Sequence, residues 1–346
     1  CIRMSGGVAW YPEDALDLDT LKKYADFAMY EVKHSTKGEV REFDMEHYRA
    51  GVYAMEQRSD FEKLIRERRV DYCFQPIVSA HDGHVVAYEA LMRPQLPTLR
   101  SPITVMQLAS EMGRLYDIEK LTFFRACECY EELEAAGKLD ADALIFVNSI
   151  ASVSLSDEDW ASYCEAHRAI LPKLVVEITE EEEMNERELE RKRNVPGATG
   201  VFALDDYGSG YSNGNSLLTV EPKYVKVDIA IIQGIDTDAD KQQFLRALID
   251  YAHPRGVQVL AEGVETLSEL RKVLEMGVDL LQGYCLAPPA AEPGAIDEKA
   301  AEVIAEVERQ KAEPGRSRVL KSKKHRLCIG ICAGTEGDTL SILLLK

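Results

Sequence analysis

The chain has no hydrophobic run long enough to cross a bilayer, and acidic side chains outnumber basic ones. No signal peptide is recognisable. Lysine and arginine number 41 against 60 aspartate and glutamate residues, so the formal net charge is −19. Binding to a nucleic-acid polymer needs a basic surface, which this composition argues against. We therefore expect a cytoplasmic protein that binds neither DNA nor RNA. Because the chain starts at Cys1 without a methionine, we expect it to begin inside a longer protein, and any membrane anchor would lie upstream.

Paired C-x-x-C spacings are also absent, although the chain has eight cysteines. Several of these cysteines fall within apolar runs. Buried free thiols in a reducing compartment are the simplest interpretation, with disulfides and a zinc site as the alternatives.

The overall composition is typical of a folded protein, with 46% hydrophobic and 29% charged residues. A length of 346 residues allows one large domain and a smaller piece. We expect four zones: a truncated domain at 1–48, a charged helical connector at 49–69, the main domain at 70–290, and a helix with a tail at 291–346. The tail contains a basic stretch, Arg316–Arg326, which is interpreted as solvated; a patch for anionic partners is the alternative.

The first zone is too small to bury a core by itself. Its sequence predicts a strand at Gly7–Trp10, a helix over Leu18–Lys33 and an edge strand at Glu39–Phe43. These elements are typical of the end of a longer domain.

The main domain alternates short apolar strands with amphipathic helices. The predicted strands are Tyr72–Val78, Val85–Leu91, Ala143–Asn148, Leu174–Ile178, Val201–Asp205, Tyr224–Val227, Val257–Ala261 and Val278–Leu281, and the predicted helices include Ile118–Ala136, Lys241–His253 and Leu267–Met276. Such repeated α/β units favour a (βα)8 barrel over an open doubly wound sheet. The first two strands are joined by a short turn, so we expect one antiparallel strand. The segment Met184–Gly197 is short, and the helix there is expected to be reduced.

Polar side chains end nearly every predicted strand. They are Glu89, Asn148, Glu177, Asp205, Asp206, Lys226, Asp228, Glu262 and Gln282. In a parallel barrel the carboxyl ends of the strands meet at one rim, where active sites lie. Carboxylates gathered there repel one another unless cations neutralise them, and oxygen ligands favour Mg²⁺ or Mn²⁺ over zinc. Bound cations would also let this acidic protein bind an anionic substrate.

The pair Asp205-Asp206 follows an apolar strand and precedes the glycine-rich loop Tyr207–Tyr211. Adjacent acids can place one carboxylate between two metal ions about 3.5–4 Å apart, the arrangement that cleaves phosphodiesters. A turn with a helix cap is the alternative. Lys226 interrupts an apolar strand, where an unpaired lysine is costly. It is expected either to pair with Asp228 or to orient the attacking water and offset phosphate charge.

These segments resemble the EAL domain, the family of cyclic di-GMP phosphodiesterases named for a motif present here as Glu89-Ala90-Leu91. The resemblance runs from Val70 to Pro289 and includes Gln75-Pro76-Ile77-Val78, Glu177-Ile178-Thr179-Glu180, Lys226-Val227-Asp228, Glu262-Gly263-Val264-Glu265-Thr266 and Gln282-Gly283-Tyr284. It implies hydrolysis of cyclic di-GMP to linear pGpG by water that two Mg²⁺ or Mn²⁺ ions activate, in bacterial second-messenger signalling. It also implies a homodimer formed near the glycine-rich loop.

The resemblance implies a role for each matching residue. The first metal would be bound by Glu89, Asn148, Glu177 and Asp205, and the second by Asp205 and Asp206, with Glu262 directly or through water. Lys226 would contact the attacking water, and Glu180 would hold the glycine-rich loop and couple dimerisation to metal binding. Lys226, Glu262 and Glu180 form the implied catalytic set, whereas Gln75, Arg93, Asp228, Glu265 and Gln282 would contact the substrate.

The first zone resembles the C-terminal end of an α+β GGDEF (diguanylate cyclase) domain, and the signature loop of that family is absent from this sequence. We therefore expect no synthesis of cyclic di-GMP. Two alternatives to hydrolysis stay open. One is a non-catalytic receptor that binds cyclic di-GMP and acts through a protein partner, although such receptors usually lack a metal ligand. The other is a sugar-phosphate or carbohydrate enzyme, which fits the fold but not the asparagine and paired aspartates.

Overall fold

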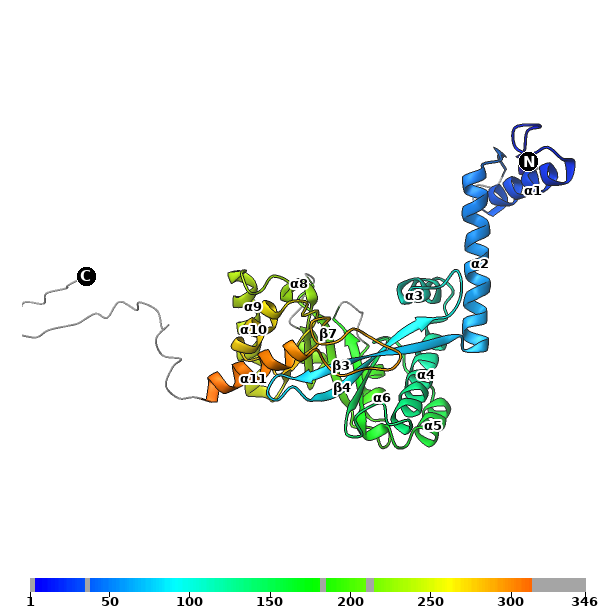
Figure 1. The fold of residues 1–346 in the computed structure, drawn as a ribbon. Coiled ribbons are helices and arrows are strands. Elements are labelled where there is room, and N and C mark those ends of the chain that lie inside the picture. Colours follow the sequence, from blue (N-terminus) through cyan, green and yellow to red (C-terminus); the bar gives the residue numbers. More distant parts are fainter. Residues whose placement is uncertain (1–3, 35–37, 181–184, 210–214, 313–346) are drawn as a thin grey trace, which may run out of the picture.

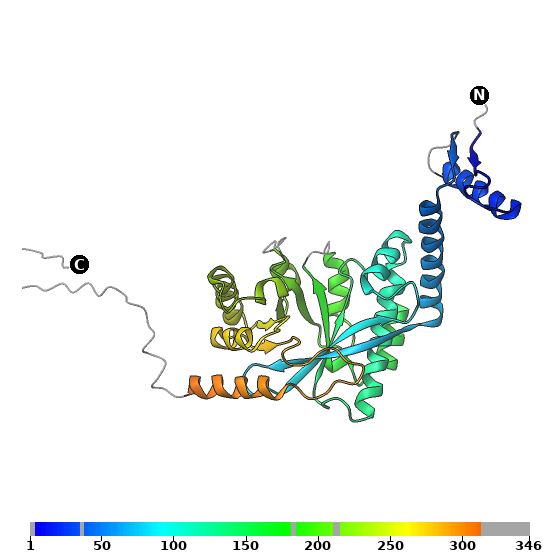
Figure 2. The ribbon, with the colours of Figure 1, turned by 45° about the horizontal axis from the view of Figure 1, so that its top comes forward.

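The computed structural model describes residues 4–34, 38–180, 185–209 and 215–312. The basic stretch Arg316–Arg326 and the end of the glycine-rich loop, Gly210-Tyr211, lie outside these residues. Figures 1 and 2 show a small N-terminal piece, a long helix and a barrel that follow one another along the chain. The five cysteines of the described part are free thiols. No helix in that part is both long and apolar enough to span a membrane.

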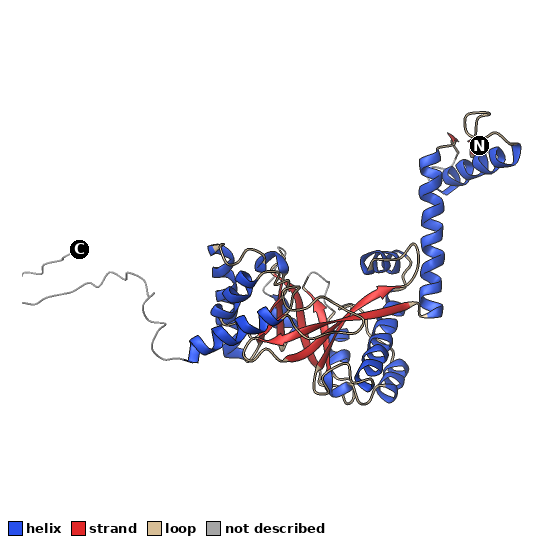
Figure 3. Ribbon diagram, in the orientation of Figure 1, coloured by secondary structure: helices blue, strands red, loops and turns tan. Residues whose placement is uncertain are grey.

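Eight strands close into a barrel in the order β10-β3-β4-β5-β6-β7-β8-β9 (Figure 3). They are β3 (Val70–Ser79), β4 (Val85–Pro94), β5 (Leu144–Asn148), β6 (Leu174–Thr179), β7 (Val201–Tyr207), β8 (Tyr224–Val227), β9 (Gln258–Ala261) and β10 (Leu280–Leu281). Strand β3 runs antiparallel to both of its neighbours, and the other pairs are parallel. The predicted (βα)8 barrel with one antiparallel strand is therefore confirmed.

Helices follow the strands and cover the outside of the barrel. They are α3 (Pro102–Glu111), α4 (Leu115–Ala135), α5 (Asp157–Ala166), α6 (Glu186–Arg193), α7 (Asn215–Val220), α8 (Ile229–Ile232), α9 (Ala239–Ala252) and α10 (Leu267–Met276), with 3-10 turns η1 (Leu171–Lys173) and η2 (His253–Arg255). The reduced helix expected between Met184 and Gly197 is α6, with 8 residues. The last described helix, α11 (Glu298–Ala312), buries Val303, Ile304 and Val307 in the core that α10 also joins.

The N-terminal piece contains two short strands and a helix. Strand β1 (Gly6–Val8) pairs in parallel with β2 (Val40–Glu42), and α1 (Leu18–His34) packs against both. Helix α2 (Met45–Glu67) then runs through the predicted connector to the barrel. It begins at Asp44, whose carboxylate accepts a hydrogen bond from the His47 amide, a typical N-cap. Its C-terminal end buries Phe61 and Leu64 in the core beside β3 and α4.

Candidate metal centre and active site

A layer of polar side chains lies directly above an apolar layer inside the barrel. Each strand gives one residue to the apolar layer: Ile77, Ala87, Phe146, Val175, Ala203, Tyr224, Leu260 and Leu280. Because side chains alternate along a strand, the residue two positions nearer the rim faces the same way. Those residues are Gln75, Glu89, Asn148, Glu177, Asp205, Lys226, Glu262 and Gln282. Eight residues predicted for the site are thus brought together at the carboxyl ends of the parallel strands.

Lys226 is the centre of this layer and is 1% exposed. Its Nζ lies 2.7 Å from Oε1 of Glu177, 2.9 Å from Oδ1 of Asp205 and 2.8 Å from Oε1 of Glu262. Oε1 of Glu89 is 3.5 Å away. Lys226 does not pair with Asp228, whose carboxylate instead accepts a hydrogen bond from the Ala230 amide and caps α8. The lysine therefore contacts four acids of the barrel interior rather than Asp228, and its role toward an attacking water stays a prediction.

The acids form two groups that share one residue. In the inner group, oxygens of Glu89, Glu177 and Asp205 lie within 4.8 Å of one another. In the outer group, oxygens of Asp205, Asp206 and Glu262 do the same. A shared carboxylate between two neighbouring oxygen clusters is the arrangement expected of a two-metal site.

Asp206 reaches the outer group because its backbone departs from the strand. Its φ is +54°, in the left-handed region, which costs a non-glycine residue about 1 kcal/mol. The pairing of β7 with β8 shifts register between Leu204 and Tyr207, around the same residue. In a regular strand two successive side chains would point to opposite faces. The shift lets two adjacent acids contribute to one group, although it was not predicted from the sequence.

The electrostatics of this layer favour cations. When all five carboxylates are ionised, one ammonium leaves four negative charges unbalanced, and two divalent ions carry four positive charges. Burial, opposed by the Lys226 ammonium, raises the pKa of Glu177 and of Glu262 well above the usual range. Burial and the neighbouring Asp205 raise the pKa of Asp206 to about 6. Burial lowers the pKa of Lys226, but the four surrounding acids more than offset this and raise it overall.

Glu177 provides a specific test of whether these residues fit a metal. It is 1% exposed; its Oε1 forms an ion pair with Nζ of Lys226 at 2.7 Å, and its Oε2 has no hydrogen-bond partner among the described residues. A buried carboxylate oxygen without a hydrogen bond is costly. A hard divalent cation would satisfy those oxygens, and the all-oxygen ligand set suits Mg²⁺ or Mn²⁺. The residues therefore fit the ions that the sequence predicts.

Two glutamines connect the inner group to a neighbouring cavity. Nε2 of Gln282 donates to Oε2 of Glu89 at 2.6 Å and to Oε1 of Gln75 at 3.2 Å. These three residues, with Leu91, Glu262, Glu265 and Tyr284, line a cavity of about 330 Å³. Gly283 closes the turn between Gln282 and Tyr284, where an added Cβ would lie 2.2 Å from the carbonyl oxygen of Val264. Only glycine fits there, so the turn that presents Gln282 depends on it.

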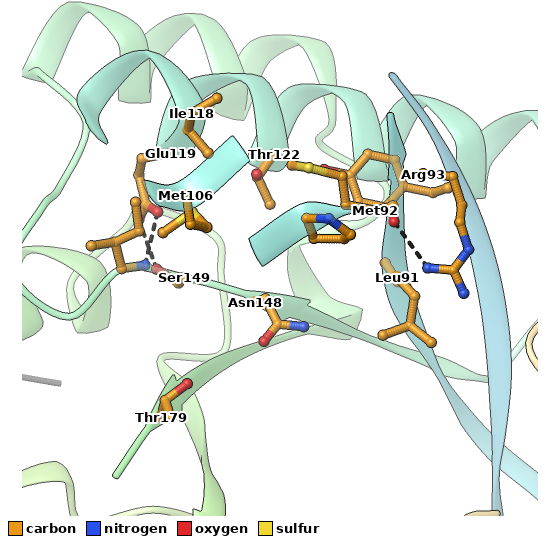
Figure 4. Close-up of a pocket in the computed structure, with 14 residues that line it drawn as sticks. Leu91, Met92, Arg93, Met106, Ile118, Glu119, Thr122, Asn148, Ser149 and Thr179 are labelled. Carbon is orange, nitrogen blue, oxygen red and sulfur yellow. Dashed lines mark hydrogen bonds between the residues drawn. The ribbon is translucent and has the colours of Figure 1, made fainter. Parts of the chain in front are cut away.

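A second cavity of about 290 Å³ is also lined by Leu91 (Figure 4). It is lined by Arg93, Asn148 and Thr179, together with apolar residues such as Met106 and Ile118. The guanidinium of Arg93 donates from Nη1 to the carbonyl oxygen of Met92 at 2.9 Å. Arg93 therefore lines a cavity beside the inner group, and it makes no ion pair with the acids there.

The remaining predicted residues lie at the rim. Oε2 of Glu180, just after β6, accepts a hydrogen bond from the Gly208 amide at 3.4 Å, and Oε1 accepts one from the Ser216 hydroxyl at 3.0 Å. Glu180 thus contacts Gly208 in the glycine-rich loop and Ser216 at the start of α7, on either side of the undescribed residues 210–214. Asp228 caps α8, and Glu265 is exposed at the edge of the Gln282 cavity.

Sequence reasoning missed Glu269, a buried acid that holds the loop after Glu262. Its carboxylate accepts hydrogen bonds from the amides of Gly234 at 2.8 Å, Glu265 at 3.1 Å and Thr266 at 3.0 Å. Burial raises the pKa of Glu269, but the three backbone hydrogen bonds lower it by more, so the net pKa is below the usual value. The capping-box spacing Thr266-x-x-Glu269 was the signal that could have revealed it.

Replacing Glu269 with alanine should lower stability clearly without removing a metal ligand. Three partly buried backbone amides would lose their acceptor, which we expect to cost roughly 1–3 kcal/mol. We expect the melting temperature to fall by about 5 °C or more. Glu275→Ala, an exposed position on the same helix, is the matched control. Since the folded pKa of Glu269 is lowered, its contribution is present above about pH 4.5 and is lost on acidification. Equal melting temperatures for the two variants would contradict this role.

Comparison with known proteins agrees with this geometry. Residues 58–289 match the family model of the EAL domain. The cyclic di-GMP phosphodiesterase NbdA of Pseudomonas aeruginosa is 28% identical over 295 residues, covering 82% of this chain and 37% of NbdA. The chain thus spans well under half the length of this relative.

Solved structures show the same fold. The PaMucR phosphodiesterase in complex with c-di-GMP superposes with a TM-score of 0.59 at 24% identity, covering 68% of this chain and 97% of that one. Klebsiella pneumoniae BlrP1, in a complex with manganese and cyclic di-GMP at pH 9.0, gives a TM-score of 0.57 at 25% identity. The match covers 66% of this chain and 58% of that one. With its closed barrel, its two acid groups and this family match, the chain belongs to the EAL domain family.

Proposed function

We propose that this protein hydrolyses cyclic di-GMP to linear pGpG in a two-metal site, with Mg²⁺ or Mn²⁺ as the cofactor. The observation that carries the proposal is the pair of acid groups that share Asp205 around the buried Lys226. Relatives named as cyclic di-GMP phosphodiesterases, and a relative solved with manganese and cyclic di-GMP, support the choice of substrate and ion.

The inner group with Asn148 would hold one ion, and the outer group would hold the other. When bound, the ions supply an activated water and offset the charge of the phosphate. Lys226 would orient that water and donate a hydrogen bond to it, since its ammonium already lies between both groups. Glu262 would hold the second ion directly or through water, and Glu180 would keep the glycine-rich loop beside the site.

The two cavities that share Leu91 fit a substrate with two bases joined through phosphates. Each is about 300 Å³ in volume, and Leu91 lines both. A base in each cavity would leave one phosphodiester over the inner group between them. Gln75, Gln282, Asp228 and Glu265 would contact the substrate from one side. Arg93 would turn from the Met92 carbonyl to a phosphate, for which its guanidinium is suited.

Replacing Glu89 with alanine tests hydrolysis directly. The wild type should convert cyclic di-GMP to pGpG when Mg²⁺ or Mn²⁺ is added, and Glu89→Ala should lower the rate by about a thousandfold or more. Chromatography of the nucleotides gives both rate and product. If the folded wild type binds cyclic di-GMP tightly without turnover in either ion, the protein is a receptor that acts through a partner, and the proposal of catalysis is wrong.

The unbalanced charge also predicts how pH affects the metal-free protein. The pKa of Asp206 is raised in the fold, so the folded state binds extra protons, and stability is lost as pH rises from about 4 to about 6. In EDTA, Asp206→Asn should therefore melt several degrees above the wild type at pH 8 and at the same temperature at pH 4. Mn²⁺ should stabilise the wild type more than Asp206→Asn, so the difference in melting temperature at pH 8 should disappear. If Asp206→Asn is no more stable than the wild type at pH 8 in EDTA, the assigned rise in the pKa of Asp206 is contradicted.

We further propose a cytoplasmic homodimer that forms near the glycine-rich loop. Leu218 on α7, just beyond that loop, is 64% exposed and supports an interface there. Residues 1–48 would be the end of a GGDEF domain, 49–69 the connector, 70–290 the phosphodiesterase domain and 291–346 the terminal helix and tail. Disruption of a dimer by Leu218→Glu, measured by sedimentation, would test the interface.

A further inference from the structure

A second buried lysine lies outside the acid groups, and its hydrogen bonds are complete. Lys192 on α6 is 2% exposed, and Glu119 on α4 is 1% exposed. Nζ of Lys192 lies 2.8 Å from Oε1 of Glu119 and donates to Oγ of Ser149 at 2.6 Å and to the carbonyl oxygen of Ile150 at 2.5 Å. The three protons of the ammonium thus have three acceptors.

The carboxylate of Glu119 is satisfied in the same way. Its Oε1 accepts a hydrogen bond from the Ser149 hydroxyl at 2.7 Å (Figure 4), and its Oε2 accepts one from the Ile150 amide at 2.9 Å. This differs from Glu177, whose Oε2 has no hydrogen-bond partner among the described residues. A closed network needs no ion or ligand, so it is suited to holding a segment of backbone rather than to chemistry.

The segment that this network holds is the one that directly follows Asn148. The Ser149 amide donates to the carbonyl oxygen of Glu177 at 3.0 Å, which fixes the segment to β6 on one side. Lys192 and Glu119 fix it on the other side, from two helices that lie far apart in the sequence. Asn148 itself makes one long side-chain hydrogen bond, from Nδ2 to Oε1 of Glu89 at 3.3 Å. Its direction therefore depends largely on the backbone after it.

We propose that Lys192 and Glu119 are positioning residues that set the direction of Asn148 and, through it, the metal affinity of the inner group. The inference rests on the proposed function for the identity of the ions. Partners that orient metal ligands typically change metal affinity by about 10–100-fold when they are removed. Neither residue contacts an acid of either group, so their effect is indirect.

The test is a calorimetric titration of the full chain with Mn²⁺ alone, without nucleotide. Ser149→Ala removes one hydroxyl of the network and should weaken one of two Mn²⁺ sites by about tenfold, and Lys192→Met should weaken it by more. Arg191→Met is the matched control. Arg191 is the preceding residue of α6 and binds the carbonyl oxygen of Leu155 and Oδ1 of Asp157, away from Asn148. It should leave Mn²⁺ affinity unchanged.

Activity gives a second readout that a merely structural role would not produce. In Ser149→Ala the Mn²⁺ concentration for half-maximal activity should rise about tenfold, while kcat at saturating Mn²⁺ returns to the wild-type value. Wild-type Mn²⁺ affinity in folded Ser149→Ala, or equal weakening in Arg191→Met, would overturn the inference and leave the proposed function standing. A wild type that binds no Mn²⁺ would instead refute the proposed function and this inference with it.

Discussion

Asp205→Asn should remove nearly all hydrolysis while leaving the metal-free protein at least as stable as the wild type. Asp205 is the residue that the inner and outer groups share, so one substitution weakens both. We expect kcat to fall by at least about a thousandfold, which corresponds to roughly 4 kcal/mol of barrier. The neutral amide keeps an oxygen to accept the hydrogen bond that the Asp206 amide donates to Oδ1 at 3.0 Å.

Stability should respond in the opposite direction to activity. The substitution removes one of the unbalanced negative charges, and Lys226 keeps Glu177 and Glu262 within 2.8 Å. In EDTA the melting temperature should therefore stay level or rise. Asp142→Asn, an exposed acid just before β5, is the control for loss of a charge elsewhere, and its activity should match the wild type. Substantial hydrolysis by Asp205→Asn in Mn²⁺ would show that the shared position is not needed.

Lys226→Met should affect both activity and stability. Without the ammonium, four acids around one buried position lose their only positive partner in the described structure. Breaking a buried ion pair by removing one partner typically costs about 3–5 kcal/mol, so we expect a large drop in the melting temperature in EDTA at pH 7. Activity should fall by at least about a thousandfold, since the group that orients the water is lost.

Added Mn²⁺ separates the two effects of Lys226. The ions neutralise the acids, so Mn²⁺ should restore much of the melting temperature of Lys226→Met without restoring its activity. Lys138→Met, an exposed lysine paired with Glu292, is the control for a lost ion pair and should change neither property. If Lys226→Met in EDTA melted as the wild type does, the acids would not depend on that ammonium, and the electrostatic account of the layer would be wrong.

The fold and most of the site could be predicted because the informative residues lie on strands. The order of apolar strands and helices predicted the barrel, and the short turn after the first strand predicted the antiparallel β3. A polar residue that follows an apolar strand can be read directly, as at Asn148 and Glu177. Strand ends were less accurate: β3 begins at Val70 rather than Tyr72, although buried Val70, exposed Asp71 and buried Tyr72 continue the alternation.

The features that were missed depend on contacts between distant parts of the chain. Glu119 and Lys192 lie on α4 and α6, where charged residues normally indicate a solvated helix face, and nothing in the sequence indicates that they are buried together. The left-handed backbone of Asp206 was missed because it depends on a register shift between β7 and β8. The phosphate contact of Arg93 stays a prediction: its guanidinium lies against the Met92 carbonyl, and the residue lines the second cavity.

Anomalous diffraction from crystals soaked in Mn²⁺ would locate the ions of the proposed two-metal site. We expect two manganese peaks at the barrel rim, about 3.5–4 Å apart, with Asp205 between them. One peak should lie among Glu89, Asn148 and Glu177, and the other beside Asp206 and Glu262. No peak among these residues at saturating Mn²⁺, or ions bound only elsewhere on the acidic surface, would contradict a two-metal phosphodiesterase.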